Sequence, residues 1–187
     1  GTTTVIWTIT DAAGNTATDT QVVTVTDDED PTITAPADAT ASADEGSCAA
    51  ATVALGTPVS ADNCSGSVVT NNAPATFEVG TTTVIWTVTD AAGNSATAEQ
   101  TVTVTDDEDP TITAPADATA STDAASCVAA TVALGTPVTA DNCSGSVVTN
   151  NAPASFEVGT TTVIWTVTDA AGNTATAEQT VTVTDDE

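Results

Sequence analysis

The sequence predicts an all-β protein built from tandem β-sandwich modules with a period of 79 residues. The period is set by the octapeptide GTTTVIWT, which begins at Gly1, Gly80 and Gly159. Valine, isoleucine and threonine alternate in short runs that are typical of strands. Turn residues divide these runs roughly every eight to twelve residues, which favours a sandwich, and helix signals are absent.

The repeat divides the chain into one partial and two whole units. Residues 28–106 and 107–185 differ at only seven positions. We therefore expect residues 1–27 to be the last hairpin of a repeat, residues 28–106 to be one repeat, and residues 107–187 to be a second repeat with the start of the next linker. Neither end resembles a cap, so we interpret the chain as part of a longer tandem array.

The alternating runs of one repeat give its expected strands in order. They are residues 31–36, 49–55, 66–70, 75–79, 82–89 and 96–105. The last two are joined by DAAGN, residues 90–94, a turn in which Gly93 suits a positive φ. Trp7 and Trp165 repeat the position of Trp86, so we expect all three tryptophans in a core. Alternation places the other expected core side chains around Trp86: Val84, Val88, Phe77, Val79, Val102 and Val104.

The charge of the chain excludes several classes of partner. The 187 residues include 26 aspartates and glutamates but no lysine, arginine or histidine, for a formal charge of −26. Nucleic acids and anionic lipid surfaces are excluded as electrostatic partners, because phosphate binding rests on lysine and arginine. No apolar run approaches the length of a membrane span, so we expect no membrane insertion. The acids must be solvated, screened by salt or bridged by cations.

Four cysteines occur as one pair in each whole repeat, Cys48 with Cys64 and Cys127 with Cys143. They allow three connectivities. We expect disulfides Cys48–Cys64 and Cys127–Cys143, because each repeat should fold alone and a turn near Gly56 would bring the first pair together. A zinc site would need more thiolates or histidine, and a catalytic cysteine would need a base. Structural disulfides imply an oxidising compartment.

Several motifs resemble a known family. GTTTVIWTVTDAAGN followed by TVTVTD, together with DNC and the linker pattern D-x-x-P-x-I, is similar to the hyalin repeat. The resemblance covers both whole repeats and the partial one. It implies an immunoglobulin-like fold, an extracellular location, a structural or adhesive role and no catalysis.

Each linker carries four consecutive acids that need a counter-charge. In a sandwich whose strands run alternately up and down, the tip of the DAAGN hairpin points back towards the linker that opens its repeat. Carboxylate and amide oxygens at that density suit Ca²⁺, whereas zinc and copper prefer nitrogen or sulfur ligands. We therefore predict one Ca²⁺ site at each linker. The predicted ligands are Asp27, Asp28, Glu29, Asp30, Asp90 and Asn94 in one site, and Asp106, Asp107, Glu108, Asp109, Asp169 and Asn173 in the other.

Other interpretations of these residues stay open at this point. The ADNC loop is a second candidate contributor, through Asp62 and Asn63 or through Asp141 and Asn142. Mg²⁺ is an alternative ion, although it enters all-protein cages more reluctantly. The acidic linker could instead be a solvated spacer, and the turn residues could serve only as turn caps.

These expectations combine into a structural role. We expect an extracellular or cell-surface protein that forms a fibre or stalk of disulfide-stapled repeats with Ca²⁺-stiffened linkers. The alternative is an adhesin in which these repeats are spacers for a ligand-binding tip elsewhere. The expected partners are other copies of the same repeat array, including lateral contacts in a filament. An enzyme is not expected, because it would need paired carboxylates in a cleft, and the acids cluster at junctions and turns instead.

Overall fold

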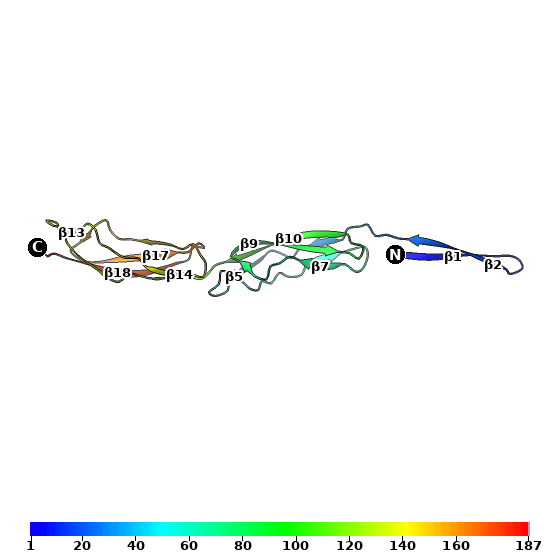
Figure 1. Ribbon diagram of the computed structural model, residues 1–187, viewed down its shortest axis with the longest axis horizontal. Coiled ribbons are helices and arrows are strands. Elements are labelled where there is room, and N and C mark those ends of the chain that lie inside the picture. The colour runs from blue at the N-terminus through cyan, green and yellow to red at the C-terminus, as the bar shows by residue number, and fades with distance from the viewer. Residues whose placement is uncertain (187) are drawn as a thin grey trace. The chain divides into compact units, whose positions relative to one another are not determined.

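The computed structural model describes residues 1–186, and every regular element in that range is a β-strand (Figure 1). No helix in those residues is long and apolar enough to cross a membrane. The partial repeat contains β1 (Thr2–Thr10) and β2 (Thr16–Thr24). The first whole repeat contains β3 (Thr32–Thr34), β4 (Ala39–Ser42), β5 (Ala49–Ala50), β6 (Val59–Ala61), β7 (Val68–Asn71), β8 (Phe77–Glu78), β9 (Gly80–Thr89) and β10 (Ser95–Thr105). The second contains β11 (Thr111–Thr113), β12 (Ala118–Ser121), β13 (Val128–Ala129), β14 (Val138–Ala140), β15 (Val147–Asn150), β16 (Phe156–Glu157), β17 (Gly159–Thr168) and β18 (Thr174–Thr184).

The chain forms two compact units whose limits differ from those of the sequence repeats. The first unit contains residues 1–37, 55–73 and 83–100. The second contains residues 38–54, residues 74–82 and the chain from residue 101 onwards. The second unit therefore includes the whole of the later repeat together with three segments of the earlier one.

The second unit contains one complete immunoglobulin-like sandwich. One layer is a four-stranded sheet in the order β12-β18-β17-β15, and the antiparallel pairs β11-β14 and β13-β16 form the other layer. β12 runs parallel to β18, with Ala118 opposite Val181, whereas β17 is antiparallel to both β18 and β15. The core consists of the buried side chains Ala129, Phe156, Val163, Trp165, Val181 and Val183.

The first whole repeat has the same arrangement of strands. Its four-stranded sheet has the order β4-β10-β9-β7, and its short pairs are β3-β6 and β5-β8. The buried side chains include most of the predicted core, namely Phe77, Val84, Trp86, Val88, Val102 and Val104. The DAAGN turn between β9 and β10 also forms as predicted, because Gly93 has a φ of +102°.

The prediction of a strand over residues 49–55 is wrong. Only β5 is a strand in that range, and it pairs with β8. β4 and β6 were not predicted, because both are short and consist mainly of alanine and serine rather than bulky β-branched residues. β4 forms because its backbone adds an edge strand beside β10, where Ala39 lies opposite Val102.

A buried glutamine joins the two layers of each sandwich. Gln179 is 1% exposed, and its side-chain amide donates to the carbonyls of Ala116 at 2.7 Å and Leu134 at 2.8 Å. Its Oε1 accepts a hydrogen bond of 3.0 Å from the indole N–H of Trp165. Gln100 makes the equivalent set of contacts in the earlier repeat. The tryptophan therefore enters the core with its polar N–H satisfied, as a buried indole requires.

The hairpin of β1 and β2 differs from its equivalents in the whole repeats. Its strands pair antiparallel over their full length, from Thr2 opposite Thr24 to Thr10 opposite Thr16. Trp7 is nevertheless 62% exposed, so the prediction that it lies in a core is wrong for the structure described. The physical reason is that residues 1–27 contribute one hairpin of a sheet and no second layer.

Candidate metal centre and the inter-repeat disulfide

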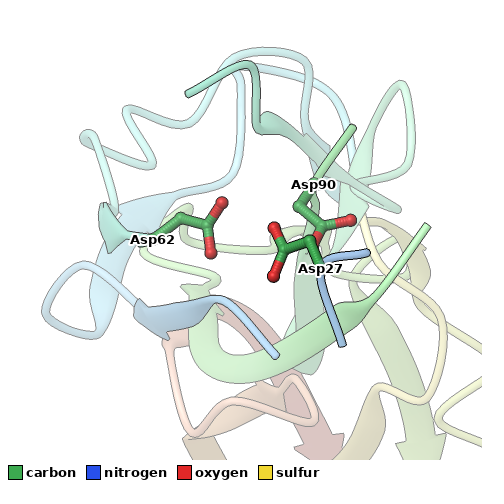
Figure 2. A group of neighbouring side chains, drawn as sticks. All are labelled: Asp27, Asp62 and Asp90. Carbon is green, nitrogen blue, oxygen red and sulfur yellow. The ribbon is translucent and has the colours of Figure 1, made fainter. Parts of the chain in front are cut away.

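Near the start of each whole repeat, three aspartates from three different segments of chain lie close together. One comes from the linker, one from the loop after the short strand β6 or β14, and one from the DAAGN turn. Figure 2 shows the first group, with the side chains converging from separate parts of the fold. In each group, one carboxylate oxygen from every aspartate lies within 4.8 Å of the others. These aspartate clusters are Asp27, Asp62 and Asp90 in the first unit, and Asp106, Asp141 and Asp169 in the second.

The DAAGN turn fixes the third aspartate of each cluster. Oδ1 of Asp169 accepts the backbone N–H of Gly172 at 2.6 Å and of Asn173 at 2.7 Å. The side-chain amide of Asn173 donates to Asp169 Oδ2 at 2.8 Å and to the carbonyl of Asp106 at 3.1 Å. Asn173 therefore ties the turn to the linker, and Asn94 makes the equivalent contacts in the first unit.

Several carboxylate oxygens in the clusters are buried without a hydrogen-bond donor. They are Oδ2 of Asp106 and both carboxylate oxygens of Asp141 and of Asp62. The amide oxygen of Asn142 is buried without a partner as well. Buried polar atoms are almost always partnered, and a buried carboxylate without compensation is costly. The chain has no basic side chain that could supply the missing positive charge.

The environment of Asp141 opposes its negative charge. Burial, followed by the charges of Asp106 and Asp169, raises the pKa of Asp141. The nearby backbone N–H groups of Cys143 and Asn142 offset this only in part. Without a cation, the folded protein takes up a proton at Asp141 more readily than the unfolded chain does. Its stability therefore increases as the pH falls through this raised pKa.

The turn aspartates titrate in the opposite sense. Burial alone would raise the pKa of Asp169, but hydrogen bonds from the Asn173 side chain and the turn backbone outweigh it and lower the pKa. The pKa of Asp90 is lowered by the same balance. Their stabilising contribution is present above the pKa of an unfolded aspartate, and it is lost as the pH falls through the lowered values.

The predicted ligands divide into groups with different contacts. Four of them belong to the clusters, and Asn94 and Asn173 brace the turns. Two linker acids instead bind the earlier repeat: Asp107 accepts the Ser42 hydroxyl at 2.5 Å, and Glu108 accepts the Gly46 N–H at 2.7 Å. Glu29 accepts the side-chain amide of Asn63. Asp28, Asp30 and Asp109 are exposed and lie outside the clusters.

Asp62 and Asp141 are the cluster members that the predicted ligand set lacked. Sequence reasoning placed them only as candidate contributors through the ADNC loop. The feature that could have identified them is the position of that loop. It directly follows β6 or β14, and these strands pair with β3 or β11, the strands that follow the acidic linkers. Without knowledge of that pairing, the loop could not be assigned to the same end of the sandwich as the linker.

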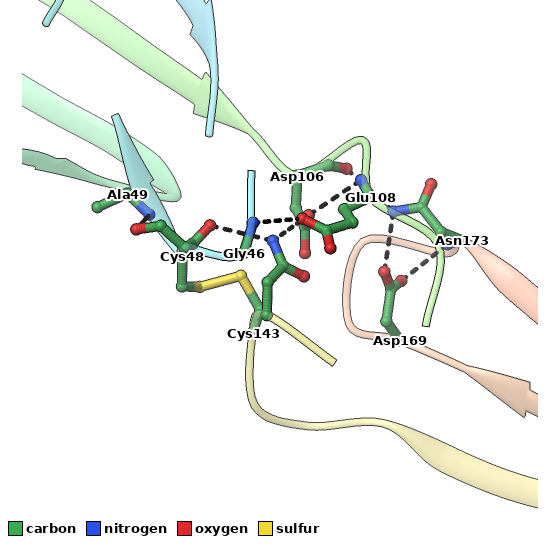
Figure 3. Close-up of a disulfide and its surroundings, with 10 residues drawn as sticks. Gly46, Cys48, Ala49, Asp106, Glu108, Cys143, Asp169 and Asn173 are labelled. Carbon is green, nitrogen blue, oxygen red and sulfur yellow. Dashed lines mark hydrogen bonds between the residues drawn. A yellow bond between two sulfur atoms is a disulfide. The ribbon is translucent and has the colours of Figure 1, made fainter. Parts of the chain in front are cut away.

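The disulfide joins one repeat to the next, so both predicted pairings, Cys48–Cys64 and Cys127–Cys143, are wrong. Cys48 is bonded to Cys143, with their Cα atoms 4.9 Å apart (Figure 3). Cys64 and Cys127 are exposed free thiols. The thiol of Cys64 donates a hydrogen bond to the Asp27 carboxylate, and this bond, burial and the charges of the surrounding carboxylates raise the pKa of the thiol.

The strand pairing explains why the predicted disulfides do not form. The segment after β5 does not return beside it as a hairpin, because β5 pairs with β8 whereas β6 pairs with β3. The carbonyl of Cys48 accepts the N–H of Val79, beside β8, whereas Cys64 lies beside Asp27. The two cysteines of one repeat thus lie in different units.

Polar contacts surround the observed disulfide. We call residues 44–48 and 123–127 the thiol loops, since each ends at a cysteine. The side-chain amide of Asn142 donates to the carbonyl of Ser47 at 3.0 Å and to Asp106 Oδ1 at 2.9 Å. Together with the bond from Gly46 N–H to Glu108, these bonds attach the first thiol loop to the linker and to the loop that carries Cys143 (Figure 3).

A model of the HYR domain family matches residues 26–104 and 105–183. A comparison with curated protein sequences found no match. Among solved structures, protocadherin gamma B2 extracellular cadherin domains 1–5 is similar at 10% identity and a TM-score of 0.45, over 100% of this chain and 46% of that chain. Protocadherin gamma B7 extracellular cadherin domains 1–4 is similar at 14% identity and a TM-score of 0.44, over 97% of this chain and 57% of that chain. This chain thus spans about half the length of those cadherin chains. The two family matches cover most of its residues, and the chain belongs to the HYR domain family.

Proposed function

We propose that this protein is an extracellular structural protein whose repeats form a fibre or surface stalk, with Ca²⁺ bound at each aspartate cluster. The HYR repeats and the disulfide between successive repeats support the structural role. The disulfide also supports a location outside the cell, where the compartment is oxidising. Nearly identical repeats favour a scaffold over an adhesin, because a specific binding face would usually make one repeat differ.

The donor-free buried oxygens of Asp106 and Asp141 are the observation that carries the calcium proposal. Both residues would bind the ion directly, together with Asp169. When bound, Ca²⁺ supplies the positive charge that the chain lacks, and it accepts carboxylate and amide oxygens in flexible geometry. Asp62, Asp27 and Asp90 would hold an ion in the same way in the first unit.

Calcium would stiffen the junction because each cluster joins three segments. The linker, the loop after the short strand and the DAAGN turn would all be held by one ion. Without the ion, three carboxylates with oxygens within 4.8 Å of one another repel, so the linker should loosen. The sandwiches should persist, because their cores and glutamine contacts contain no metal ligand.

Calcium titration of three variants tests the proposal. Asp141→Asn removes one carboxylate from the second cluster, and Asp62→Asn does the same in the first. Glu178→Gln is the matched control, because it removes one charge from an exposed position on β18. Calorimetry should show one ion per cluster, with a dissociation constant of about 0.1–1 mM, as for other extracellular calcium sites. Each cluster variant should lose one of the two ions, and the control should lose neither.

The melting temperature provides a second test, because the order of stability of Asp141→Asn and the natural chain should reverse between chelator and calcium. In chelator, Asp141→Asn should be more stable than the natural chain, because it removes a repelled charge. At calcium a hundredfold above the dissociation constant, the natural chain should gain about 2.7 kcal/mol per site, and the order should reverse. The calcium proposal fails if millimolar Ca²⁺ produces neither heat nor a melting shift in the natural chain.

Electron microscopy of the assembled native protein distinguishes the fibre from the adhesin. A uniform filament along its whole length would support the structural role. A stalk that ends in a distinct globular head would show that the repeats serve as spacers.

A further inference from the structure

The inter-repeat disulfide lies directly beside the second aspartate cluster. Cys143 follows Asp141 by two positions, so the bond to Cys48 is close in sequence to a carboxylate of the cluster. One pocket is lined by both cysteines and by Asp106, another member of the cluster. The disulfide therefore attaches the thiol loop of the earlier repeat to the metal centre of the later one.

Asn142, which lies between Asp141 and Cys143, connects this thiol loop to the cluster. Its side-chain amide donates to the carbonyl of Ser47 at 3.0 Å and to Asp106 Oδ1 at 2.9 Å. The two bonds use both N–H groups of the amide. The reversed orientation would place the amide oxygen against two acceptors, so the partners fix the side chain. Asn142 therefore holds Asp106 in a position that the thiol loop sets.

A second series of hydrogen bonds leads from the thiol loop to the same aspartate (Figure 3). Gly46 N–H donates to Glu108 Oε2 at 2.7 Å, and the backbone N–H of Glu108 donates to Asp106 Oδ1 at 3.2 Å. Oδ1 of Asp106 thus accepts from both Asn142 and Glu108, whereas Oδ2 is buried without a donor. The two series of bonds hold Oδ1 and leave Oδ2 available to a cation.

We propose, on the basis of the calcium function proposed above, that the thiol loop of the earlier repeat completes the calcium site of the later one. The Cys48–Cys143 disulfide and bound Ca²⁺ then stabilise each other. Coupling between two sites is reciprocal. If reduction weakens calcium binding, calcium makes the disulfide harder to reduce by the same factor.

Reduction separates the thiol loop from the calcium site. Dithiothreitol transfers two electrons and two protons to the S–S bond, which becomes the thiols of Cys48 and Cys143, and the reagent closes into a cyclic disulfide. Asn142 then loses the fixed carbonyl of Ser47. The three carboxylates, whose oxygens lie within 4.8 Å of one another, are free to move apart. We expect the calcium dissociation constant to rise about tenfold, within the usual range of coupling between two sites.

Calcium titration of the oxidised and reduced full chain tests this coupling. Cys64→Ser and Cys127→Ser leave a single disulfide to reduce, and Asp62→Asn removes the first cluster. Dithiothreitol should raise the dissociation constant of this chain about tenfold while its far-ultraviolet circular dichroism stays unchanged. Asp141→Asn in place of Asp62→Asn leaves the first cluster as the matched reference. Its affinity should not change, because the one disulfide of residues 1–186 joins other segments.

Redox equilibration gives the reciprocal measurement. The Asp62→Asn chain with the two serine substitutions is equilibrated with mixtures of reduced and oxidised dithiothreitol, in calcium or in chelator. Alkylation with iodoacetamide then counts the free thiols. In calcium that saturates both forms, the reduction potential of the disulfide should be lower by about 30 mV, which corresponds to a tenfold coupling for two electrons.

Asn142→Ala tests the connection without breaking the disulfide. It should weaken calcium binding in the oxidised chain about tenfold and reduce the effect of calcium on the reduction potential. A role in stability alone would lower the melting temperature but leave the effect of calcium in place. Asn63→Ala is the matched control, because it changes the equivalent residue of the first repeat. It should alter neither quantity.

The outcomes separate this proposal from the calcium function. An oxidised chain that binds no calcium would overturn both. Calcium binding with the same affinity before and after reduction, and with the same reduction potential in calcium and chelator, would overturn only the coupling. If reduction unfolds the chain, the oxidised Asn142→Ala variant decides, and an unchanged calcium affinity in that variant overturns the proposal.

Discussion

Replacing Gln179 with leucine tests whether a buried polar contact holds the two layers of the HYR sandwich together. Leucine has a similar volume, but the change leaves three groups without a partner: the carbonyls of Ala116 and Leu134 and the indole N–H of Trp165. At about 2 kcal/mol for each unsatisfied group, the loss is about 6 kcal/mol. The buried leucine side chain returns about 2 kcal/mol. We therefore expect unfolding to cost about 4 kcal/mol less.

The assay is urea unfolding of the full chain, followed by tryptophan fluorescence and far-ultraviolet circular dichroism. The partial repeat supplies a matched control, because Gln21 contacts Trp7 on an exposed face. Gln21→Leu should change the stability by less than about 0.5 kcal/mol, as for other surface substitutions. The reasoning is refuted if Gln179→Leu unfolds at the same urea concentration as the natural chain, or if both variants lose the same stability.

Three further predictions concern the site and the turns. In chelator, the melting temperature should increase as the pH falls from 7 towards about 4, because the pKa of Asp141 is raised, and Asp141→Asn should reduce this increase. Saturating calcium should also suppress it, since the ion requires the ionised carboxylate. Asn173→Ala removes the side-chain bonds between turn and linker, so it should lower the free energy of unfolding by about 1–2 kcal/mol in thermal melts. Gly56→Ala should destabilise more than Gly93→Ala in urea unfolding: both have positive φ, but only the former places a Cβ 3.2 Å from Pro36.

The parts of the fold that sequence predicted well have strong local signals. β9 and β10 alternate valine and isoleucine with threonine, so their inward side chains could be assigned from the period alone. The turn between them was marked by Gly93, whose positive φ suits glycine. β4 and β6 lack such signals, because their short alanine and serine runs become strands only through pairing with distant partners.

The candidate site was predictable in part for the same reason. The linker and turn aspartates of each cluster could be placed together from the sequence alone. In a sandwich whose strands run alternately up and down, the tip of the DAAGN hairpin lies at the same end as the linker that opens the repeat. The aspartate after β6 depends on the pairing of β6 with β3, which no local pattern reveals. The disulfide prediction was wrong for a similar reason. It assumed that each repeat forms its disulfide within itself, whereas the observed bond joins two repeats. The pairing of β5 with β8 instead leaves Cys48 beside the following linker.

The bond between Cys48 and Cys143 has a consequence for a chain under tension. The two cysteines are 95 residues apart in sequence, so pulling on the termini loads the backbone outside this interval and the S–S bond itself. At about 3.3–3.6 Å for each extended residue, roughly 330 Å of contour length is withheld from extension. After reduction, unfolding of the enclosed strands would release that length in force spectroscopy. Oxidised chains would therefore break at a short extension, whereas reduced chains would lengthen and dissipate work before they break.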